Sequence, residues 1–480
     1  MTRSRASVSG PKPAAEPRAA PVDLPDWLST RLEAMAPAPS RAGWVVAFSG
    51  GIDSLALLAG LQRLRGARPR RARVPLRAIH VDHGLSPRSG GWASACRRQC
   101  RALGVPLTVH RVRVVLGRGV SVESAARDAR YARLRDSLRA GEILFTAHHL
   151  DDQFETLLLQ LMRGAGVNGL AAMPEVASFG RGLHLRPLLT LERRQLLGWV
   201  RAQGLEWIED DSNADLRFDR NYLRLEVLPR LRSRWPAAAR VAARSAGHLA
   251  DARALLAELA AQDLAAVLRD RAIDIAALAS LSAPRRRNAV RAWIVAQGLP
   301  VPDTRHLARI LGELCAARRD ARPMVAWPGA EVRRHRDRLY AIAPLVSAAA
   351  ASAAGATATL EWRWRRARPL ELGDGLGSLV LRRDARGPLE GTALPATLRV
   401  SFRVGGERLR IRPGGPRRAV KELLRAGGVL PWMRAQLPLL RAGDRLVAVA
   451  DLCVDAAFAA RRGSRSRYRL EWSGGPPIRA

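Results

Sequence analysis

Cysteine is scarce in this chain of 480 residues, which contains four. So few cysteines exclude a disulfide-stabilised scaffold at this length, and the chain has no Cys-x-x-Cys pair that would suggest a zinc ribbon or an iron–sulfur site. Cys96 and Cys100 share an apolar helical stripe with Trp92 and Leu103, a pattern that favours core packing over metal binding. This cysteine usage is typical of a protein in the reducing cytoplasm.

Long apolar runs are also missing. No stretch reaches about 18 uninterrupted apolar residues, the length that a membrane-spanning helix requires, so we expect no membrane association. Residues 1–25 are rich in Arg, Ala, Pro and Ser and lack the apolar core of a secretory signal, which predicts a disordered tail. The hydrophobic and charged contents, 48% and 26%, are those of a globular protein with roughly two to four domains.

Negative charge is scarce relative to positive charge. Lys and Arg together number 80 against 43 Asp and Glu, a formal net charge of +37. Arginine supplies nearly all of it, because the only lysines are Lys12 and Lys421. A GC-rich genome would explain arginine in place of lysine but not the excess itself. A cationic excess of this size favours a polyanionic partner, and nucleic acid is the first hypothesis.

A glycine-rich motif stands where a predicted strand, residues 44–48, ends and a predicted helix begins: Ser49, Gly50, Gly51, Ile52, Asp53 and Ser54. Adjacent glycines let the backbone turn sharply and approach a ligand, and the free N–H groups of a helix start suit a phosphate. The serines add hydroxyl donors, and Asp53 could hold a magnesium ion or orient the loop. A plain strand–turn–helix connection is the alternative. The motif lacks the Lys of a Walker loop.

Predicted strands and helices alternate through the first part of the chain. Strands are expected at residues 44–48, 76–81, 105–112 and 143–146, and helices at residues 91–103 and 121–139. This order indicates an α/β domain whose parallel sheet carries helices on both faces. Ligands of such sheets bind at the carboxyl ends of the strands, which is where the glycine-rich motif, His80, Asp82 and His148 fall.

A polar cluster follows the fourth predicted strand. If a helix begins near His149, then His148, Asp152 and Glu155 line one side of it. Two carboxylates and an imidazole at a strand end could position magnesium and substrate, or carry out acid–base chemistry.

Two arginines are further candidates. Arg127 shares a helix face with Glu123 and Arg130, a pattern that by itself favours a solvated face with one ion pair. Arg220 follows a segment rich in Asp and Asn, which could simply cap helices and form turns. Arg220 could instead hold a phosphate.

Taken together, these stretches resemble the bacterial tRNA(Ile)-lysidine synthetases, a family of the N-type ATP pyrophosphatase (PP-loop) superfamily. The matching segments, in the family's order, are Ser49–Ser54, His80–Leu85, Glu123–Tyr131, His148–Thr156, Arg163–Leu170, Arg186–Leu189 and Asp211–Arg224. The resemblance implies that ATP adenylates the C2 oxygen of the wobble cytidine in the isoleucine tRNA with a CAU anticodon, releasing pyrophosphate. The ε-amine of L-lysine then attacks C2 and displaces AMP, giving lysidine, which pairs with A and not G.

The resemblance also implies roles for individual residues. Residues 49–54 and His80 would bind ATP, with Asp53 as a ligand of Mg²⁺. The catalytic set would be Asp53, Arg127, His148, Asp152 and Glu155. In this set Asp53, Asp152 and Glu155 would hold magnesium or the lysine ammonium, and His148 and Arg127 would orient the adenylated base. Arg220 would hold a tRNA phosphate.

The rest of the chain predicts further domains, in which the basic helix end at Arg285, Arg286, Arg287 and Arg291 is either the solvated face of a helical bundle or a surface for tRNA phosphates. Amphipathic helices at residues 235–268, 284–297 and 304–317 indicate a mainly helical domain. The C-terminal segment resembles the small α+β C-terminal domain of the longer family members, which implies that Lys421 and Arg434 grip the acceptor stem. The arginine-rich insert at residues 65–73 has no predicted role. The expected domains are residues 1–25 (tail), 26–233 (PP-loop catalytic), 234–345 (helical), 346–395 (linker with short strands) and 396–480 (C-terminal).

Two other functions fit part of the pattern. One is a non-catalytic tRNA-binding protein on a PP-loop fold, against which the intact motif and the polar residues after the fourth strand argue. The other is a different PP-loop ligase, such as a tRNA thiolase, whose paired cysteines this chain lacks. The expected cofactors are ATP and Mg²⁺, and the expected partners are the CAU isoleucine tRNA and L-lysine. The resemblance also allows a homodimer.

Overall fold

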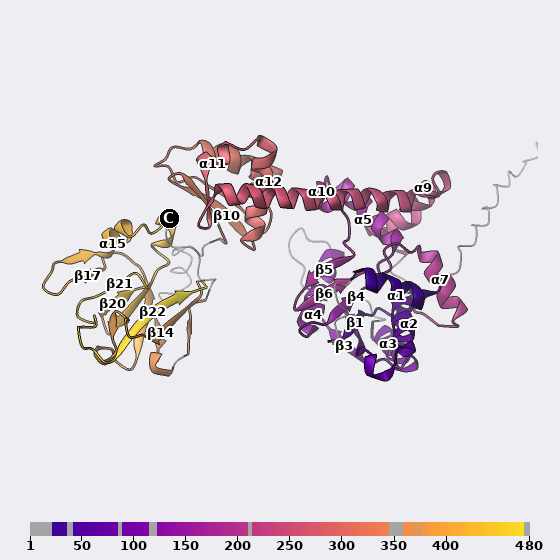
Figure 1. The fold of residues 1–480 in the computed structure, drawn as a ribbon, viewed down its shortest axis with the longest axis horizontal. Helices are drawn as coiled ribbons and strands as arrows, with labels where there is room; N and C mark the ends of the chain where they lie inside the picture. Colours follow the sequence, from indigo (N-terminus) through magenta and orange to yellow (C-terminus); the bar gives the residue numbers. More distant parts are fainter. Residues whose placement is uncertain are drawn as a thin grey trace, which may run out of the picture. The chain divides into compact units, whose positions relative to one another are not determined.

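The chain forms two compact units, residues 1–255 and 256–480, in a computed structural model (Figure 1). The structure describes residues 22–35, 42–84, 89–114, 122–209, 214–344, 359–366, 368–373 and 376–474. The predicted tail up to residue 21 lies outside the described residues. So do residues 346–358 of the predicted linker, Leu85, the side chain of Glu123 and residues 211–213.

A six-stranded sheet is the centre of the first unit, with the strand order β3-β2-β1-β4-β6-β5. Its strands are β1 Trp44–Ala47, β2 Leu76–Asp82, β3 Leu107–Arg111, β4 Ile143–Phe145, β5 Val176–Phe179 and β6 Gly182–Leu185. Neighbouring strands from β3 to β6 are parallel, and β5 joins the edge antiparallel to β6. The predicted parallel sheet is therefore confirmed.

Helices cover both faces of this sheet because successive strand residues point to opposite sides. Trp44 and Val46 pack in one core with the helices α1 Leu24–Met35, α2 Ile52–Ala67, α3 Ser89–Ala102 and α7 Arg193–Ala202. Val45, between them, packs in a second core against α4 Val122–Ser137. Further helices of this unit are α5 Leu150–Met162, α6 Val167–Leu170, α8 Asp219–Tyr222 with a π-helical turn Leu223–Val227, and α9 Leu228–Arg234.

The arginine-rich insert after α2 is tied down by its own arginines. Arg65 Nε donates to the carbonyl of Val74 at 2.9 Å, and Arg73 Nη2 donates to that of Gly66 at 2.9 Å. The guanidinium of Arg68 lies over the Trp44 ring. These contacts give three of the arginines a role in closing the turn between α2 and β2.

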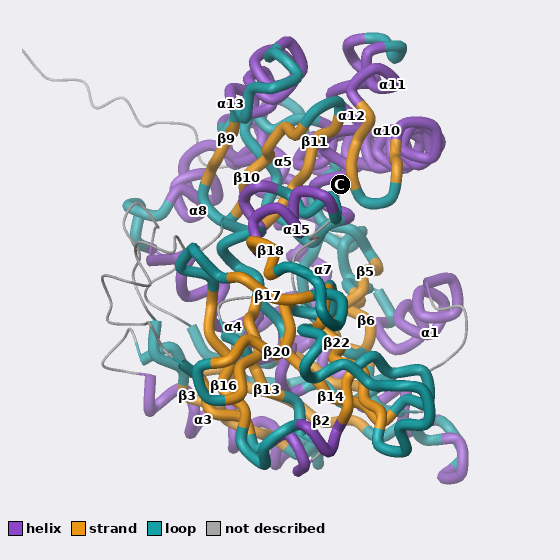
Figure 2. Tube along the Cα trace, turned by 90° about the vertical axis from the view of Figure 1, so that its left-hand side faces the viewer, coloured by secondary structure: helices purple, strands orange, loops and turns teal. Residues whose placement is uncertain are grey.

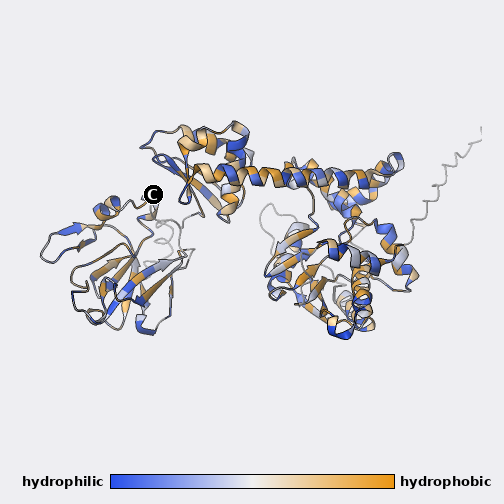
Figure 3. Cartoon of the chain, viewed as in Figure 1, coloured by the Kyte–Doolittle hydropathy of each residue, from blue (hydrophilic) through white to orange (hydrophobic). Residues whose placement is uncertain are grey.

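The predicted long amphipathic helix is α10 Ala238–Val267, which carries hydrophobic and hydrophilic residues along its length (Figure 3). Beyond it lie α11 Ile275–Ala279, α12 Ala283–Ala296 and α13 Thr304–Arg309, the last continuing into a π-helical turn Ile310–Leu314. A five-stranded sheet of order β7-β8-β11-β10-β9 accompanies these helices. Figure 2 shows β9, β10 and β11 of this sheet next to one another. The strands are β7 Leu268–Arg269, β8 Ala272–Asp274, β9 Met324–Trp327, β10 Ala330–His335 and β11 Arg338–Ile342.

The sequence analysis did not predict this sheet. Its strands are short, and the longest pair is joined by a tight turn in which Arg336 adopts a positive φ of 54°. Positive φ is unusual for a residue with a side chain, so arginine gives no turn signal there.

The C-terminal region contains two antiparallel sheets with a common core (Figure 1). One comprises β12 Leu360–Trp362, β16 Leu398–Phe402, β19 Pro438–Ala442, β20 Arg445–Val449 and β21 Cys453–Val454. The other comprises β13 Leu370–Glu371, β14 Ser378–Arg383, β15 Leu389–Glu390 and β22 Arg467–Ser473. The strands β12–β15 thus belong to the C-terminal sheets, and the boundary predicted at 395/396 falls inside them.

A small hairpin and a short helix form the segment around Lys421, which the sequence analysis compared with the C-terminal domain of the family. The hairpin is β17 Arg408–Arg410 with β18 Arg417–Ala419, and α15 Val420–Ala426 follows directly. Val420 and Leu424 of α15 are buried in one core with Tyr340 of β11. Trp432 extends this contact, since its ring lies 5.6 Å from that of Tyr340. The helix α15 therefore shares a core with the sheet β7-β8-β11-β10-β9.

Candidate active site

The glycine-rich motif forms a tight loop between β1 and α2. Gly50 has a φ of +83°, and a Cβ there would come within 2.5 Å of Ile208 Cδ1 and 2.8 Å of Cys96 Sγ. Only glycine fits this position. The Gly50 carbonyl accepts hydrogen bonds from Gln99 Nε2 at 3.2 Å and from Ile208 N at 3.1 Å, so the wall behind the loop fixes its path.

The two serines hold the loop from within. Ser49 N donates to Ser54 Oγ at 3.2 Å, and Ser54 Oγ donates to the Gly51 carbonyl at 3.0 Å. Gly51 is the N-cap of α2 and has no side-chain cap, while Ile52 is buried in the core. The first N–H groups of α2 are consequently open to an anion, as a phosphate-binding helix start requires.

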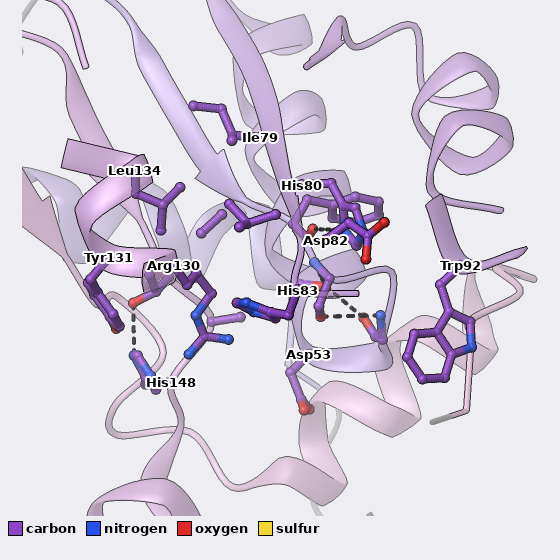
Figure 4. A pocket seen from close by; sticks show the side chains of 18 of the residues that line it. Asp53, Ile79, His80, Asp82, His83, Trp92, Arg130, Tyr131, Leu134 and His148 are labelled. Atoms are coloured by element: carbon purple, nitrogen blue, oxygen red, sulfur yellow. Dashed lines mark hydrogen bonds between the residues drawn. The ribbon is translucent and has the colours of Figure 1, made fainter. Parts of the chain in front are cut away.

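A cavity of about 690 Å³ opens at the carboxyl ends of β1, β2 and β4 (Figure 4). Its volume is in the range of small-molecule and cofactor sites. Ser49, Gly51, Asp53 and Ser54 line it on the loop side. Other lining residues include His80, Asp82, His83, Trp92, Arg130, Tyr131, Thr146, His148, Asp215 and Phe218. The structure thus brings the loop, His80 and His148 together around one space.

Asp53 faces a buried imidazole. His149 Nε2 lies 3.7 Å from Asp53 Oδ2, and Arg193 Nε lies 3.5 Å from Asp53 Oδ1. Burial alone would raise the pKa of Asp53, but the hydrogen bond and charge of His149, with the charges of Arg193 and Arg224, lower it. Asp53 is therefore ionised at neutral pH.

His149 is a cation within the site. Its ring is 3.4 Å from Asp152 and 3.5 Å from Asp151, in addition to Asp53. Burial would lower the pKa of His149, but these three carboxylates raise it to about 9. The backbone N–H of Asp152 also points at His149 Nδ1, at 3.3 Å. One long hydrogen bond is weaker than three adjacent negative charges, so we assign both ring nitrogens a proton.

Glu155 is enclosed by arginines. It is fully buried, and Arg224 donates to both of its oxygens, through Nε to Oε1 at 2.7 Å and through Nη2 to Oε2 at 3.0 Å. Arg220 Nε lies 3.0 Å from Oε2, and Arg220 Nη2 donates to Thr156 Oγ1 at 2.9 Å. Burial still raises the pKa of Glu155 although Arg224 opposes it. Glu155 and Arg220 are thus engaged with each other and do not line the cavity.

The remaining predicted residues differ in position. Asp152 is buried between His149 and Arg224, whose Nη2 lies 3.4 Å from its Oδ1. Arg127 stacks its guanidinium on the Tyr131 ring, 5.3 Å from the ring centre, and does not line the cavity. His80 is buried, with Nδ1 2.9 Å from the Phe48 carbonyl at the end of β1.

Two residues predicted to bind tRNA lie in the C-terminal region. Lys421 is exposed on α15, and its ammonium makes no hydrogen bond or ion pair with the described residues. Arg434 donates through Nε and Nη2 to the Val429 carbonyl, at 3.1 and 2.9 Å. Arg434 therefore closes the turn after α15.

Sequence reasoning missed His149, Arg224 and Arg193 as site residues. His149 appeared only as the start of a helix, and Arg224 only as the end of a matching segment. The adjacent pair His148–His149 was a usable signal, because one residue before a helix and one at its cap must point in different directions.

Metal-binding clusters, membrane-spanning helices and the cysteines were also compared with the structure. Within the described ranges, no group of three or more His, Cys, Asp or Glu residues has the arrangement of a metal site. In the same ranges no helix is long and apolar enough to cross a membrane. Cys96 and Cys100 are buried free thiols, and their burial raises the pKa of each to about 12.

A parallel sheet that ends in a glycine-rich loop at an open helix start defines a nucleotide-binding protein of the PP-loop class, and residues 27–231 match the family model of the PP-loop domain. Residues 273–340 match the TilS substrate binding domain, and residues 398–472 match the TilS substrate C-terminal domain.

Proteins similar over nearly the whole chain narrow this class to one family. The tRNA(Ile)-lysidine synthase of Coxiella burnetii is 38% identical over 88% of this chain and 91% of its own. That of Alkalilimnicola ehrlichii is 41% identical over 92% of this chain and 96% of its own, and that of Pseudomonas aeruginosa is 42% identical over 94% and 97%. The chain belongs to the tRNA(Ile)-lysidine synthase family, which confirms the resemblance found in the sequence.

Proposed function

We propose that this protein joins L-lysine to C2 of the wobble cytidine in tRNA(Ile) with a CAU anticodon, changing codon reading from AUG to AUA. The cytidine O2 attacks the α-phosphorus of ATP, and diphosphate leaves. The lysine ε-amine then attacks C2, the C2–O bond breaks, and AMP departs with that oxygen. The observation that carries the proposal is the cavity in which the open start of α2 and the Asp53 carboxylate face His148 across the strand ends.

The loop suits the first step electrostatically. Backbone N–H groups at a helix start stabilise the negative charge that develops on a leaving diphosphate. Asp53 Oδ1 is buried and accepts no hydrogen bond from the described residues, and Arg193 Nε lies 3.5 Å from it, so this oxygen is still able to coordinate a cation. Mg²⁺ takes one or two carboxylates and completes its shell with phosphate oxygens and water, so a single Asp suffices. When bound there, Mg²⁺ would neutralise charge on the phosphates.

Lysine requires a carboxylate that is not already paired, because its ammonium cannot be buried alone. Of the three acidic candidates, Glu155 is the least available, since both oxygens accept from Arg224. Asp53 Oδ1 lies 3.5 Å from Arg193 Nε and Asp152 Oδ1 lies 3.4 Å from Arg224 Nη2, so both carboxylates are less tightly paired than Glu155. We therefore assign Glu155 to positioning Arg224 and Arg220.

The cationic surface suits tRNA. The formal charge of +37 and the basic residues around α15, among them the exposed Lys421, supply attraction to phosphates.

A thiolase is disfavoured as an alternative function. The thiols of Cys96 and Cys100, whose pKa is raised to about 12, are not nucleophilic at neutral pH. A homodimer is part of the proposal, and the molar mass in solution tests it.

Incorporation of labelled lysine into purified tRNAs tests the reaction. Label is expected only on the CAU isoleucine tRNA and only with ATP, and it is expected to disappear in Asp53→Ala. Tight tRNA binding without incorporation in the wild type would instead support a non-catalytic tRNA-binding protein. Pyrophosphate release that did not depend on any tRNA would support a ligase acting on a small molecule.

A further inference from the structure

A chain of buried hydrogen bonds leads from Arg186 to His148 at the wall of the cavity. Arg186 Nη2 lies 3.1 Å from His184 Nδ1, and His184 Nε2 lies 2.8 Å from Thr146 Oγ1. Thr146 Oγ1 in turn lies 2.8 Å from His148 Nδ1 (Figure 4). His184, Thr146 and Arg186 are each less than 9% exposed, and of the three only Thr146 lines the cavity.

The direction of each proton follows from Arg186, which can only donate. His184 Nδ1 must accept from it, so His184 is neutral and carries its proton on Nε2. Burial lowers the pKa of His184 to about 3, in agreement. His184 Nε2 therefore donates to Thr146 Oγ1.

The hydroxyl of Thr146 then has one proton to place. Among the described residues its only other partner is His148 Nδ1. If His148 donated from Nδ1 instead, the hydroxyl proton of Thr146 would have no acceptor among the described residues, which is costly for a hydroxyl that is only 7% exposed. His148 Nδ1 thus accepts, and the proton of this imidazole sits on Nε2.

The fold holds this chain rigid. Thr146 directly follows β4, and His184 lies on the adjacent parallel strand β6, paired with Leu144. The His184 ring is flanked by Tyr131 and Phe179, at 5.9 and 5.6 Å between ring centres. Arg186 is fixed by a second hydrogen bond from Nη1 to the Pro174 carbonyl at 2.7 Å. These contacts hold the His184 ring and the Arg186 guanidinium in the orientations that the chain of hydrogen bonds requires.

We propose that Arg186, His184 and Thr146 are positioning residues that lock His148 in the Nε2–H tautomer, so that His148 acts as a hydrogen-bond donor and not as a general base. His148 lines the cavity, and no described residue bonds to its Nε2, which leaves this N–H for an oxygen of the bound nucleotide or base. This inference rests on the proposed function for the identity of that oxygen, a phosphoryl or pyrimidine oxygen that gains charge during adenylation. The tautomer itself does not depend on it.

Nitrogen NMR of the full chain labelled at its nine histidines measures the tautomer directly. His148 and His184, assigned by loss of signal in His148→Gln and His184→Gln, are expected to show a protonated Nε2 and an unprotonated Nδ1. Both are expected to remain neutral from pH 6 to pH 8. A proton on Nδ1 of His148, or its titration in this range, would overturn the proposal whether or not the protein forms lysidine.

Thr146 variants test the consequence for catalysis. Thr146→Val removes the hydroxyl, and kcat for tRNA-dependent pyrophosphate release is expected to fall about tenfold with KM for ATP nearly unchanged, as for loss of an orienting partner. Thr146→Ser restores the hydroxyl and is expected to recover most of kcat. Melting temperatures establish that both variants fold. Equal kcat in the two folded variants would contradict the positioning role, whereas an inactive wild type would refute the proposed function and leave the NMR result to decide the tautomer.

Discussion

His149 Nε2 lies 3.7 Å from Asp53 Oδ2, which joins the cap of α5 to the first turn of α2. The contact links the two segments that the sequence analysis placed at the same edge of the sheet. Because Asp53 also lines the cavity, the charge on His149 acts on the group that we assign to Mg²⁺. The neutral His148 and the cationic His149 are adjacent in the chain and have opposite roles.

We expect the stability of the first unit to decline as the pH rises toward 9. The pKa of His149 in the folded protein is about 9, above the ordinary value of 6.5. A raised pKa contributes stability that is complete below pH 6.5 and is lost as the pH passes the folded value, a change on the order of 3 kcal/mol. Melting temperatures of the wild type and His149→Gln between pH 6 and pH 9.5 measure it. A slope that is the same in both proteins would contradict this assignment.

Glu155→Gln is expected to destabilise the protein. It leaves the half-buried Arg224 beside a neutral amide, with Asp152 at 3.4 Å as its remaining carboxylate partner, and losing hydrogen bonds to a charged group costs about 1.5–3 kcal/mol. Denaturant unfolding checks this value. Glu226→Gln is the matched control, since its pair with Arg230 is exposed and should contribute less than about 1 kcal/mol. If Glu155→Gln unfolded like the wild type but lost lysine binding, Glu155 would be a ligand of the substrate.

Gly50 and Gly51 are expected to respond differently to alanine. Gly50→Ala places a Cβ against Ile208 at a positive φ, which costs more than about 1 kcal/mol from the backbone alone. At Gly51 the nearest atom to an added Cβ is Ser49 Oγ at 3.6 Å, an ordinary contact. Gly51→Ala should therefore fold normally and weaken ATP binding, because Gly51 lines the cavity at the start of α2. Thermal unfolding and nucleotide titration separate the two effects.

Lys421 and Arg434 are also expected to respond differently to alanine substitution, the first in tRNA binding and the second in stability. Lys421→Ala should weaken tRNA binding and reduce the slope of log affinity against log salt by about 1, with unchanged stability. Arg434→Ala should lower the melting temperature, because it removes both hydrogen bonds to the Val429 carbonyl. An unchanged salt slope in Lys421→Ala would remove this residue from the phosphate contacts.

The sequence by itself determined the class of this protein. Each strand, each helix and the glycine-rich motif is recognised from residues within a short stretch of the chain. Their order, and the order of the matching segments, can then be followed along the sequence. Such local patterns specify a parallel sheet and place His80 and His148 at one edge of it, as the structure confirms. They also identified the family.

Only the tertiary structure decided what the polar residues of the site do. Glu155 meets Arg224, which is 69 positions away, and this contact makes it a buried ion-pair partner. Likewise, the protonation of His148 depends on Arg186 and His184 across two strands, and that of His149 on Asp53 across two helices. Periodicity assigns a side chain to a face but does not specify the distant group that faces it, and pKa and hydrogen bonding depend on that group.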